Sequence, residues 1–501
     1  MTTKYNNVSN NQVIDLKDIP VHDYELFAEI NLDLMKGNPA RHCVSYFGYP
    51  DAGKIKLICC IADDDIHQIL VSSSMVERNI IIASFTAQNH NFEKFEREIH
   101  ENFGIGYTDH PWLKPLRYAY NRTDKSQRIE NFPFYEVDSE ELHEVGVGPI
   151  HAGIIEPGHF RFICNGEQIM HLEIQMGYQH RGIEQLFLQK KKLLELTTLA
   201  ESIAGDTVVG HTTAFVNLWE SLCGYKTDYS LHYARTMALE LERLANHTGD
   251  LAGVCADIAY QLGNSVYGRL RTPMVNFFQE WGGNRLAKGL IRAGKINFPF
   301  TKELGERLTE VFEAYEPDFD EITKKLFNLP SALSRMEKTG VVSYDEVLEI
   351  GTVGMAARMS GLNRDIRSSH PNNLYENIDH KPVIKNHGDV YSRVQIRKTE
   401  VKQSISYIKE LLQNVPEFKM PENFSLTPQK EKFIISLVEG WRGEICHCAI
   451  TDELGNLVLY KVKDPSFHNW MALAQSVRNN DISDFPICNK SFSLSYCGHD
   501  L

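Results

Sequence analysis

Cysteine is scarce, and its spacing offers no paired metal ligands. The 501-residue sequence holds ten cysteines, and no two of them form a Cys-x-x-Cys pair. So few cysteines exclude a disulfide-stapled fold and are typical of a reducing cytoplasm. Cys446-His447-Cys448 could belong to a metal site. In a strand, however, both cysteines share one face, and no second ligand pair has metal-site spacing, which favours a buried strand.

Long apolar runs and an excess of positive charge are also missing. No stretch approaches the roughly 18 to 20 apolar residues needed to cross a bilayer, and the first twenty residues lack the pattern of a signal or transit peptide. Lys and Arg number 52 against 66 Asp and Glu, a net charge of −14. This balance excludes nucleic acid as the expected partner. We expect a cytoplasmic protein that reaches a membrane only through partner proteins.

The common catalytic motifs are absent as well. The sequence has no Gly-x-Gly-x-x-Gly after a strand, no Walker-type Gly-Lys-Ser/Thr loop, no Gly-x-Ser-x-Gly and no His-Glu-x-x-His. Nothing therefore indicates a Rossmann dinucleotide site, a P-loop, a serine hydrolase or a zinc protease of these types.

The N-terminal part is predicted to be a compact α+β module spanning residues 1–120. Short β-branched runs at 54–61, 69–71 and 80–85 predict strands, and the last of these is expected to be buried. Residues 91–103 predict a helix with an aromatic face and with its Glu and Arg residues in solvent. The polar segment 121–144, which contains Pro133, is the expected linker.

Residues 145–501 predict a mainly α-helical domain with strands at both ends. A hairpin is expected from strands at 160–164 and 168–174 around Asn165-Gly166. A final β-rich segment covers 433–462. Between them we expect long amphipathic helices at 182–202, 211–223, 230–263, 301–327, 343–359 and 394–414.

One of these helices carries polar groups on neighbouring faces. His232, Glu240, Arg243 and His247 are separated by three, four, seven and eight residues, spacings that align along a helix. A solvated or salt-bridged face explains them as well as a chemical site does. Three consecutive lysines at 190–192 predict an exposed helix face.

Several blocks together resemble known families. Residues 95–105, with 110–113 and 115–117, resemble the 30-kDa subunit of respiratory complex I. The second unit resembles the large subunit of [NiFe]-hydrogenases and its relative, the 49-kDa subunit of complex I. The blocks that carry this second resemblance are 148–151, 156–161, 177–184, 240–247, 360–365, 388–393 and 464–469. The fusion of both modules looks like the large subunit of formate hydrogenlyase-type, membrane-bound hydrogenases.

The resemblance implies a place in a complex I-like, energy-converting oxidoreductase complex that couples electron transfer to ion translocation. The implied partners are an iron–sulfur small subunit that holds a [4Fe-4S] cluster, a ferredoxin-like subunit and integral membrane subunits. The chain itself is expected to bind no cofactor directly, with a quinone as a candidate ligand. Its implied location is peripheral, on the inner face of the cell membrane.

All four cysteine ligands of the [NiFe] centre are missing from this sequence. The two family ligand pairs fall on Ala204 and Thr207 and on Ser495 and Gly498, while Cys497 stands one residue away from a ligand position. Alanine and glycine offer no donor, and neutral hydroxyls are poor substitutes for the thiolates that such a centre needs. We therefore expect that the metal centre is absent and that the protein is not a hydrogenase.

The residues expected to line the vacated cavity are His159, Asp206, His211, His499 and Asp500. Ionisable groups there are candidate proton carriers, although a hydrogen-bonded structural role explains each of them too. Arg181 matches the arginine beside the terminal iron–sulfur cluster of complex I, where a cation favours reduction of the cluster.

Three functions stay open at this point. In the first, the vacated cavity is the end of a quinone channel. In the second, the chain is a non-catalytic scaffold or coupling subunit. In the third, the protein is a hydrogenase with unusual ligands. The residues that contact quinone in complex I are not matched, since Gly205 stands at the tyrosine position. A cavity open to an apolar tunnel would favour the quinone function, and a packed cavity would favour the scaffold.

Overall fold

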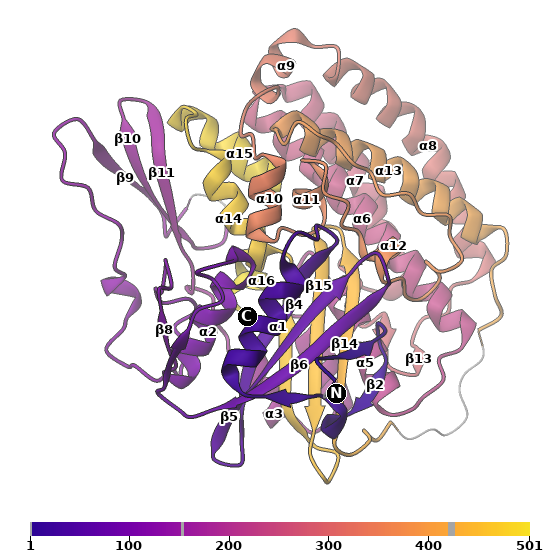
Figure 1. Cartoon of the computed structure of the whole chain (residues 1–501). Coiled ribbons are helices and arrows are strands. Elements are labelled where there is room, and N and C mark those ends of the chain that lie inside the picture. Colours follow the sequence, from indigo (N-terminus) through magenta and orange to yellow (C-terminus); the bar gives the residue numbers. More distant parts are fainter. Residues whose placement is uncertain (1–2, 152–154, 419–425) are drawn as a thin grey trace.

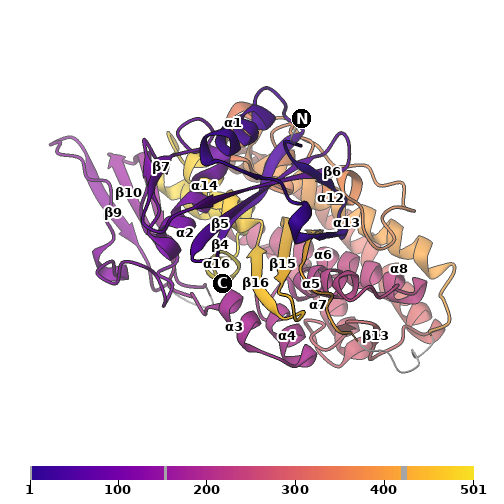
Figure 2. The same ribbon diagram turned by 60° about the horizontal axis from the view of Figure 1, so that its bottom comes forward.

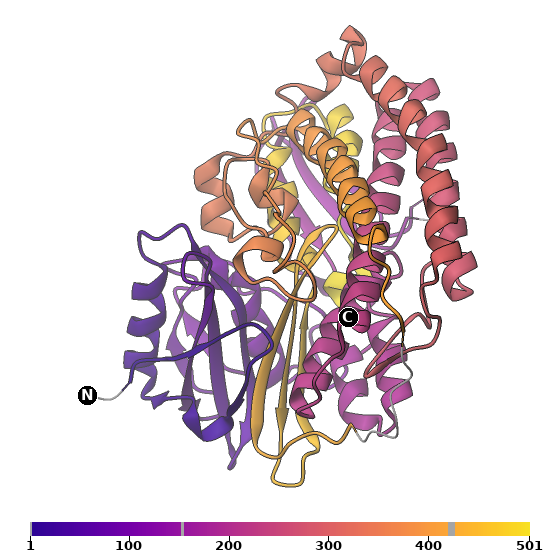
Figure 3. The ribbon, with the colours of Figure 1, turned by 90° about the vertical axis from the view of Figure 1, so that its right-hand side faces the viewer.

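Two mainly antiparallel sheets stacked face to face form the centre of the structure (Figures 1 and 3). The computed structural model describes residues 3–151, 155–418 and 426–501. Helices cover the outer face of each sheet. The fold is a mixed α/β one, with strands toward both ends of the chain and a helical middle, as the sequence predicts.

The first sheet is N-terminal and has the order β1-β6-β5-β4, with β3 parallel to β6. Its strands are β1 (Asn6–Val8), β3 (Val21–His22), β4 (Arg41–Asp51), β5 (Lys54–Asp63) and β6 (Gln68–Val76). Helices α1 (Tyr24–Met35) and α2 (Glu93–Phe103) pack on its outer face, and β7 (Ile81–Ala83) pairs with β8 (Gly106–Thr108). Every residue of β5 after Lys54 is buried because both faces of this sheet are covered.

The second sheet joins the two ends of the chain. Its order is β16-β15-β14-β2, with β2 (Val13–Asp15), β14 (Lys432–Gly440), β15 (Gly443–Thr451) and β16 (Leu457–Lys463). On β14, Phe433 and Ile435 face the first sheet, whereas Ile434 and Val438 face the helices, as alternation along a strand requires. Cys446 and Cys448 lie between the sheets with their Sγ atoms 3.8 Å apart. The prediction of a buried strand there is confirmed.

The helical middle packs on the far face of the second sheet (Figure 2). Four long helices form its body, namely α6 (Tyr229–Asp257), α7 (Gln261–Gly282), α8 (Lys302–Leu326) and α13 (Val390–Leu412). The shorter helices are α3 (Ile183–Gln189), α4 (Leu193–Ala200), α5 (Val208–Leu222), α9 (Pro330–Met336), α10 (Tyr344–Ile350), α11 (Met355–Arg358), α12 (Ile366–Ser369), α14 (Ser466–Ser476), α15 (Phe485–Phe492) and α16 (Tyr496–Asp500). Strands β12 (Ile291–Arg292) and β13 (Lys295–Ile296) form a short hairpin.

A third sheet lies at one side of the molecule (Figure 1). Its strands are β9 (His143–Val147), β10 (His159–Asn165) and β11 (Gln168–Gln175), in the order β11-β10-β9. The predicted hairpin around Asn165-Gly166 is confirmed. Strand β11 contacts α14, so this sheet is attached to the C-terminal helices.

Several predicted elements are wrong in detail. The helix expected at 182–202 is two helices, interrupted by the exposed lysines at 190–192, which are therefore not a helix face. The helix expected at 343–359 is likewise interrupted, because Gly351 and Gly354 adopt positive φ angles of 75° and 61°. The helix expected at 230–263 ends at Asp257. The run 80–85 forms only a three-residue strand, and Ile81 is 70% exposed.

Helix α2 differs most from its prediction, because its charged face is buried. Glu98 pairs with Arg117 and with Lys461 of β16, and the Glu101 carboxylate accepts backbone N–H groups of the following loop. This face packs against the C-terminal part of the chain. The predicted domains 1–120 and 145–501 thus share a charged contact, and β2 lies in the sheet of the second. Within the described residues, no helix is long and apolar enough to span a membrane.

Candidate functional site

Arg181 connects the loop before α5 with the C-terminal helix α16. Its guanidinium donates hydrogen bonds to the carbonyl oxygens of Ser202, Ile203 (2.8 Å) and Cys497 (3.2 Å). An Arg fork suits such a task because its donors lie in one rigid plane. The two segments on which the sequence placed the family ligand positions therefore meet here, and Arg181 itself stays exposed.

A buried polar chain starts at His211, on the first turn of α5. His211 Nε2 hydrogen-bonds to Asp464 Oδ2 (3.0 Å), and His211 Nδ1 lies 3.1 Å from His447 Nε2. His447 Nδ1 in turn hydrogen-bonds to the Tyr460 hydroxyl (2.8 Å). All four side chains are buried. The chain runs from the loop region into the second sheet, where His447 lies on β15 and Tyr460 on β16.

Burial sets the protonation state of His447, and hydrogen bonds set that of Asp464. Burial lowers the pKa of His447 well below its usual value, so that this imidazole is neutral. Burial alone would raise the pKa of Asp464, but the hydrogen bond and charge of His211 and the charge of Arg442 outweigh it and lower that pKa. An ionised Asp464 accepts a hydrogen bond from His211 Nε2–H, and the neutral His447 donates from one ring nitrogen and accepts at the other.

The Asp464 carboxylate occupies the space beside Gly498. A Cβ atom at position 498 would lie 2.6 Å from Asp464 Cγ and 2.7 Å from Oδ2, distances that real Cβ contacts do not show. The Ser495 hydroxyl accepts the Gly498 N–H at 2.9 Å, as the N-cap of α16. Position 498 therefore admits glycine and no side chain while Asp464 stays in place.

Arg442 joins the same two loops from the turn between β14 and β15. Its terminal nitrogens bind both oxygens of Asp206, each at 2.6 Å, and NH1 also donates to Thr207 Oγ1 (3.1 Å). Its Nε donates to the carbonyl oxygen of Ser493. The guanidinium lies over the ring of Trp441, 3.9 Å from the centroid. Asp206 is 40% exposed at its side chain, so the pair reaches the surface.

His499 and Asp500 belong to a neighbouring cluster. Asp500 Oδ1 accepts the Gly177 N–H (2.8 Å) and contacts His499 Nδ1 (2.9 Å), and Oδ2 accepts the Gln179 N–H (2.9 Å). Burial raises the pKa of Asp500 to about 6, against the two backbone hydrogen bonds that lower it. The His499 carbonyl accepts a hydrogen bond from Arg117 (2.8 Å). This cluster holds α16 against the segment after β11 and against the N-terminal module.

His159 lies apart from both clusters, in the third sheet. Its Nδ1 hydrogen-bonds to the carbonyl oxygen of Gly148 (3.1 Å), and its ring packs edge-on against Phe134. The structure thus brings Asp206 and His211 together around Arg442 and Asp464, with Arg181 beside them. It places His499 and Asp500 next to this group and His159 elsewhere.

A small cavity lies on the side of Gly205 and Asp206 that faces α6 and α7. It is also lined by Glu242 of α6 and Arg271 of α7, and it measures about 20 Å³. That volume is close to the minimum for a single water molecule. Within the described residues, no group of three or more His, Cys, Asp or Glu side chains has an arrangement that could hold a metal ion.

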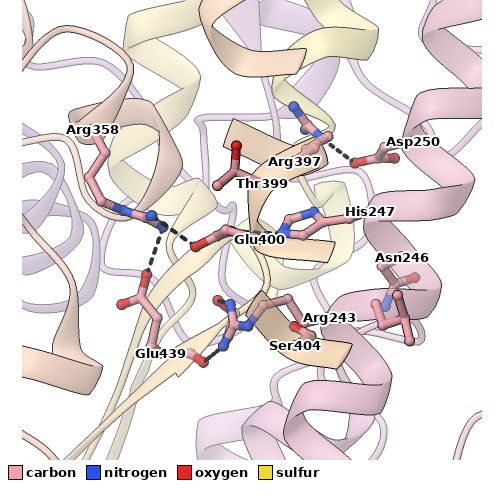
Figure 4. Close-up of polar contacts among 12 residues, drawn as sticks. Arg243, Asn246, His247, Asp250, Arg358, Arg397, Thr399, Glu400, Ser404 and Glu439 are labelled. Atoms are coloured by element: carbon pink, nitrogen blue, oxygen red, sulfur yellow. Dashed lines mark hydrogen bonds and ion pairs between the residues drawn. The ribbon is translucent and has the colours of Figure 1, made fainter. Parts of the chain in front are cut away.

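A buried network of charges lies behind this site, between α6, α13 and β14 (Figure 4). His247 Nε2 hydrogen-bonds to Glu400 (2.8 Å), and Glu400 also pairs with Arg358 (2.8 Å) and Arg367 (2.5 Å). Arg243 donates to the backbone carbonyl of Glu439 (2.8 Å). The face of α6 that carries Arg243 and His247 is therefore buried and paired with carboxylates, as the prediction of a solvated or salt-bridged face allows in its second form.

The network is arranged around one carboxyl group of unusual pKa. Burial and the neighbouring Asp365 carboxylate raise the pKa of Glu439 to about 8. The arginines outweigh burial at Glu400 and Asp365 and hold the pKa values of both well below the usual range. Glu439 is thus the member that carries a proton at neutral pH.

Sequence reasoning missed Arg442, Asp464, His447 and Tyr460. Asp464 stands in the block 464–469, which was identified by resemblance but given no role. Arg442 follows Trp441 in a tight strand connection, and nothing local distinguishes it from any turn arginine. A charged pair 236 positions apart, such as that of Asp206 and Arg442, leaves no local pattern in one sequence.

Comparison with known proteins places these features in context. Residues 261–500 match the family model described as respiratory-chain NADH dehydrogenase, 49 Kd subunit. The chain is 26% identical over 419 residues to hydrogenase-4 component G of Escherichia coli, covering 80% of this chain and 72% of that protein. It is 26% identical over 422 residues to formate hydrogenlyase subunit 5 of the same organism, covering 80% and 74%. It is also 26% identical over 383 residues to the C/D subunit of NADH-quinone oxidoreductase from Phocaeicola vulgatus, covering 70% and 73%.

Proposed function

We propose that this chain is a coupling and structural subunit of a complex I-like, energy-converting oxidoreductase complex, in which protein side chains fill the former [NiFe] site. The relatives support the assembly, because they are named as components of hydrogenases and of NADH-quinone oxidoreductase. The proposed partners are an iron–sulfur small subunit with a [4Fe-4S] cluster, a ferredoxin-like subunit and integral membrane subunits. The proposed location is the inner face of the cell membrane.

The contact between Asp464 and Gly498 is the observation that carries this proposal. A [NiFe] centre needs thiolates, and at the four matching positions Ala204 and Gly498 have no donor atom. The Thr207 hydroxyl is engaged by Arg442, and that of Ser495 by the Gly498 N–H. The residues present therefore do not fit the metal centre, and the mechanism of this subunit takes no step through it.

The packing favours a coupling role over quinone chemistry at the same place. The side chains between the two loops are engaged with one another, since Arg442 binds Asp206 and Thr207 and Asp464 binds His211. Gly205 also provides no hydroxyl for a headgroup. Arg442, Arg181 and Asp464 instead tie the loops before α5 and α16 to the second sheet, so that movement of one loop is transmitted to the other.

Arg181 is the residue through which the chain would act on its neighbour's cofactor. Its guanidinium donates three hydrogen bonds to backbone carbonyl oxygens, and these bonds fix it in an exposed position. A fixed cation close to the proposed [4Fe-4S] cluster would favour the reduced state of that cluster.

The test is to isolate the complex through a tag on this chain and identify what copurifies. The tag belongs at the N-terminus, because Leu501 is buried. We expect iron–sulfur and integral membrane subunits by mass spectrometry, a reducible [4Fe-4S] signal by electron paramagnetic resonance, and no reduction of decylubiquinone that depends on Asp206 or His211. Isolation of the chain without such partners would contradict the proposed assembly, and quinone reduction lost in His211→Ala would restore the quinone function.

A further inference from the structure

Two adjoining cavities lie between helix α2 of the N-terminal module and helix α14 of the C-terminal part. They measure about 270 and 170 Å³ and share the residues at their junction. The shared residues are His90, Glu93, Lys94, Met471 and Arg478. Neither cavity is lined by Asp206, His211 or Asp464, and the smaller one reaches His499 of the neighbouring cluster.

One wall of the smaller cavity is apolar and aromatic. It is lined by Trp112, Leu116, Leu172, Ile174, Met176, Trp470, Met471 and Ala474. Trp470 is fixed by its indole N–H, which donates to the carbonyl oxygen of Ser495, and by the ring of Tyr496, 4.8 Å away. Lys114 lies over Trp112, 4.1 Å from the ring centroid. Two rigid indoles offer surface for a flat apolar group.

Lys94 lies at the junction, without a carboxylate partner. Its Nζ donates to the carbonyl oxygen of Phe467, and among the described residues no carboxylate oxygen lies within ion-pair distance of it. Arg97, one turn further along α2, is in contrast satisfied by Glu93 and by the carbonyls of Lys114 and Pro115. An ammonium has three donors, so Lys94 has two to offer to a ligand. Burial lowers its pKa to about 7.

His468 lines the larger cavity beside Lys94 and has an unused nitrogen. The residue is 4% exposed, and its Nε2 has no hydrogen-bond partner among the described residues. A buried polar atom without a hydrogen-bond partner is destabilising. A ligand oxygen placed here would satisfy both His468 and Lys94.

We propose that this cavity binds a small organic carboxylate with a flat apolar body. The carboxylate lies between Lys94 Nζ and His468 Nε2, and the body extends against Trp112 and Trp470. The carboxylates around the two cavities have partners of their own, because Glu93 pairs with Arg97, Glu98 pairs with Arg117, Glu349 contacts His90 (3.4 Å) and Glu346 caps α10 at Ser343. Arg478 lines both cavities and adds a positive charge. Burial lowers the pKa of Lys94, against the Asp500 carboxylate, which raises it.

The test uses three probes of similar shape and different charge on the complex purified through the N-terminal tag. Binding of benzoate, benzyl alcohol and benzylammonium is measured by saturation-transfer NMR, with indole-3-acetate as a larger carboxylate. We expect the two carboxylates to bind at least ten-fold more tightly than benzyl alcohol, and benzylammonium not to bind. Equal binding of all probes, or no binding of either carboxylate, would overturn the proposal.

Variants separate the two halves of the site. Lys94→Met should weaken benzoate binding at least ten-fold, Lys94→Arg should retain it, and Ala474→Phe should block it by filling the apolar wall. Lys192→Met, which changes an exposed lysine, is the matched control. Above pH 7 the affinity of the wild-type complex should fall as Lys94 loses its proton. If benzoate binding is unchanged in Lys94→Met, or is independent of pH between 6 and 9, the carboxylate does not bind at Lys94.

Discussion

The Asp464 carboxylate lies where a side chain of residue 498 would have to be, with its Cγ 2.6 Å from an ideal Cβ on Gly498. Asp464 is held there by His211 and by the backbone N–H of Ser466 (2.8 Å). These hydrogen bonds therefore keep the Asp464 carboxylate in the space beside Gly498. The effects of substitutions at Asp464 and Gly498 on stability should be coupled.

Gly498→Ala should lower the stability of the complex by about 1–3 kcal/mol, the usual cost of overpacking a buried site. Replacing Asp464 by alanine in the same chain removes the clash, so the double variant should lose less than the sum of the single changes. Thermal unfolding of the four forms measures this coupling. Gly205→Ala is the control, because a Cβ there meets nothing within 4 Å. Additive losses would show that Asp464 does not fill the position.

Arg442→Met should destabilise more than Asp206→Asn. The arginine is buried and binds Asp206, Thr207 and the carbonyl oxygen of Ser493. The Asp206 side chain is 40% exposed, so water can replace part of the interaction that its substitution removes. We expect a loss of about 2–4 kcal/mol for the arginine change and about 1 kcal/mol for the aspartate change. Urea unfolding of the purified complex tests the order, and equal losses would mean that the exposed ion pair accounts for the whole effect of Arg442.

Glu400→Gln should disrupt the network of Figure 4. It removes one of the two carboxylates that pair with both Arg358 and Arg367. With Asp365 as the remaining shared partner, one buried positive charge is left uncompensated, which costs about 3–5 kcal/mol. The yield of assembled complex should fall accordingly. Glu410→Gln, an exposed position on the same helix α13, should change stability by less than about 0.5 kcal/mol. Similar yields for both variants would contradict the structural role of the network.

Glu439 predicts a pH dependence of stability. The pKa of this carboxyl is raised in the folded state to about 8, so the folded chain holds a proton that the unfolded chain releases near pH 4.5. The contribution of this proton to the free energy of unfolding is complete below about pH 4.5 and is lost as the pH rises toward 8. Glu439→Gln cannot lose this proton, so its melting temperature should fall less between pH 5 and 8 than that of the wild type. Glu453→Gln, on the exposed tip before β16, should leave the wild-type slope unchanged, and an equal slope in all three would contradict the assignment.

Patterns of local origin were predictable from the sequence. The alternation in β14 and β15, the Asn165-Gly166 turn and the spacing along α8 and α13 each reflect neighbours close in the chain. The burial of Glu98 could not be predicted, because its partner Lys461 lies in a distant strand. Nor could Asp464 be assigned, since no residue near it in the sequence shows that its carboxylate lies beside Gly498.

The predicted site residues also divide into those that lie together in the structure and those that do not. His211 and Asp206 were predicted from their place beside the positions that the resemblance assigns to metal ligands. The structure places them on Asp464 and Arg442, and their chemical role stays a prediction. His159 was placed there by resemblance, but the fold puts it in the third sheet, bonded to Gly148. His499 and Asp500 form a separate cluster, in which Asp500 accepts the backbone N–H groups of Gly177 and Gln179 and contacts His499.

The nickel content of the complex isolated through this chain, measured together with hydrogen uptake on the same sample, tests the central claim most directly. With the position beside Gly498 filled by Asp464, we predict iron from partner clusters, nickel at background level and no hydrogen turnover. One nickel per complex with hydrogen turnover would contradict the account.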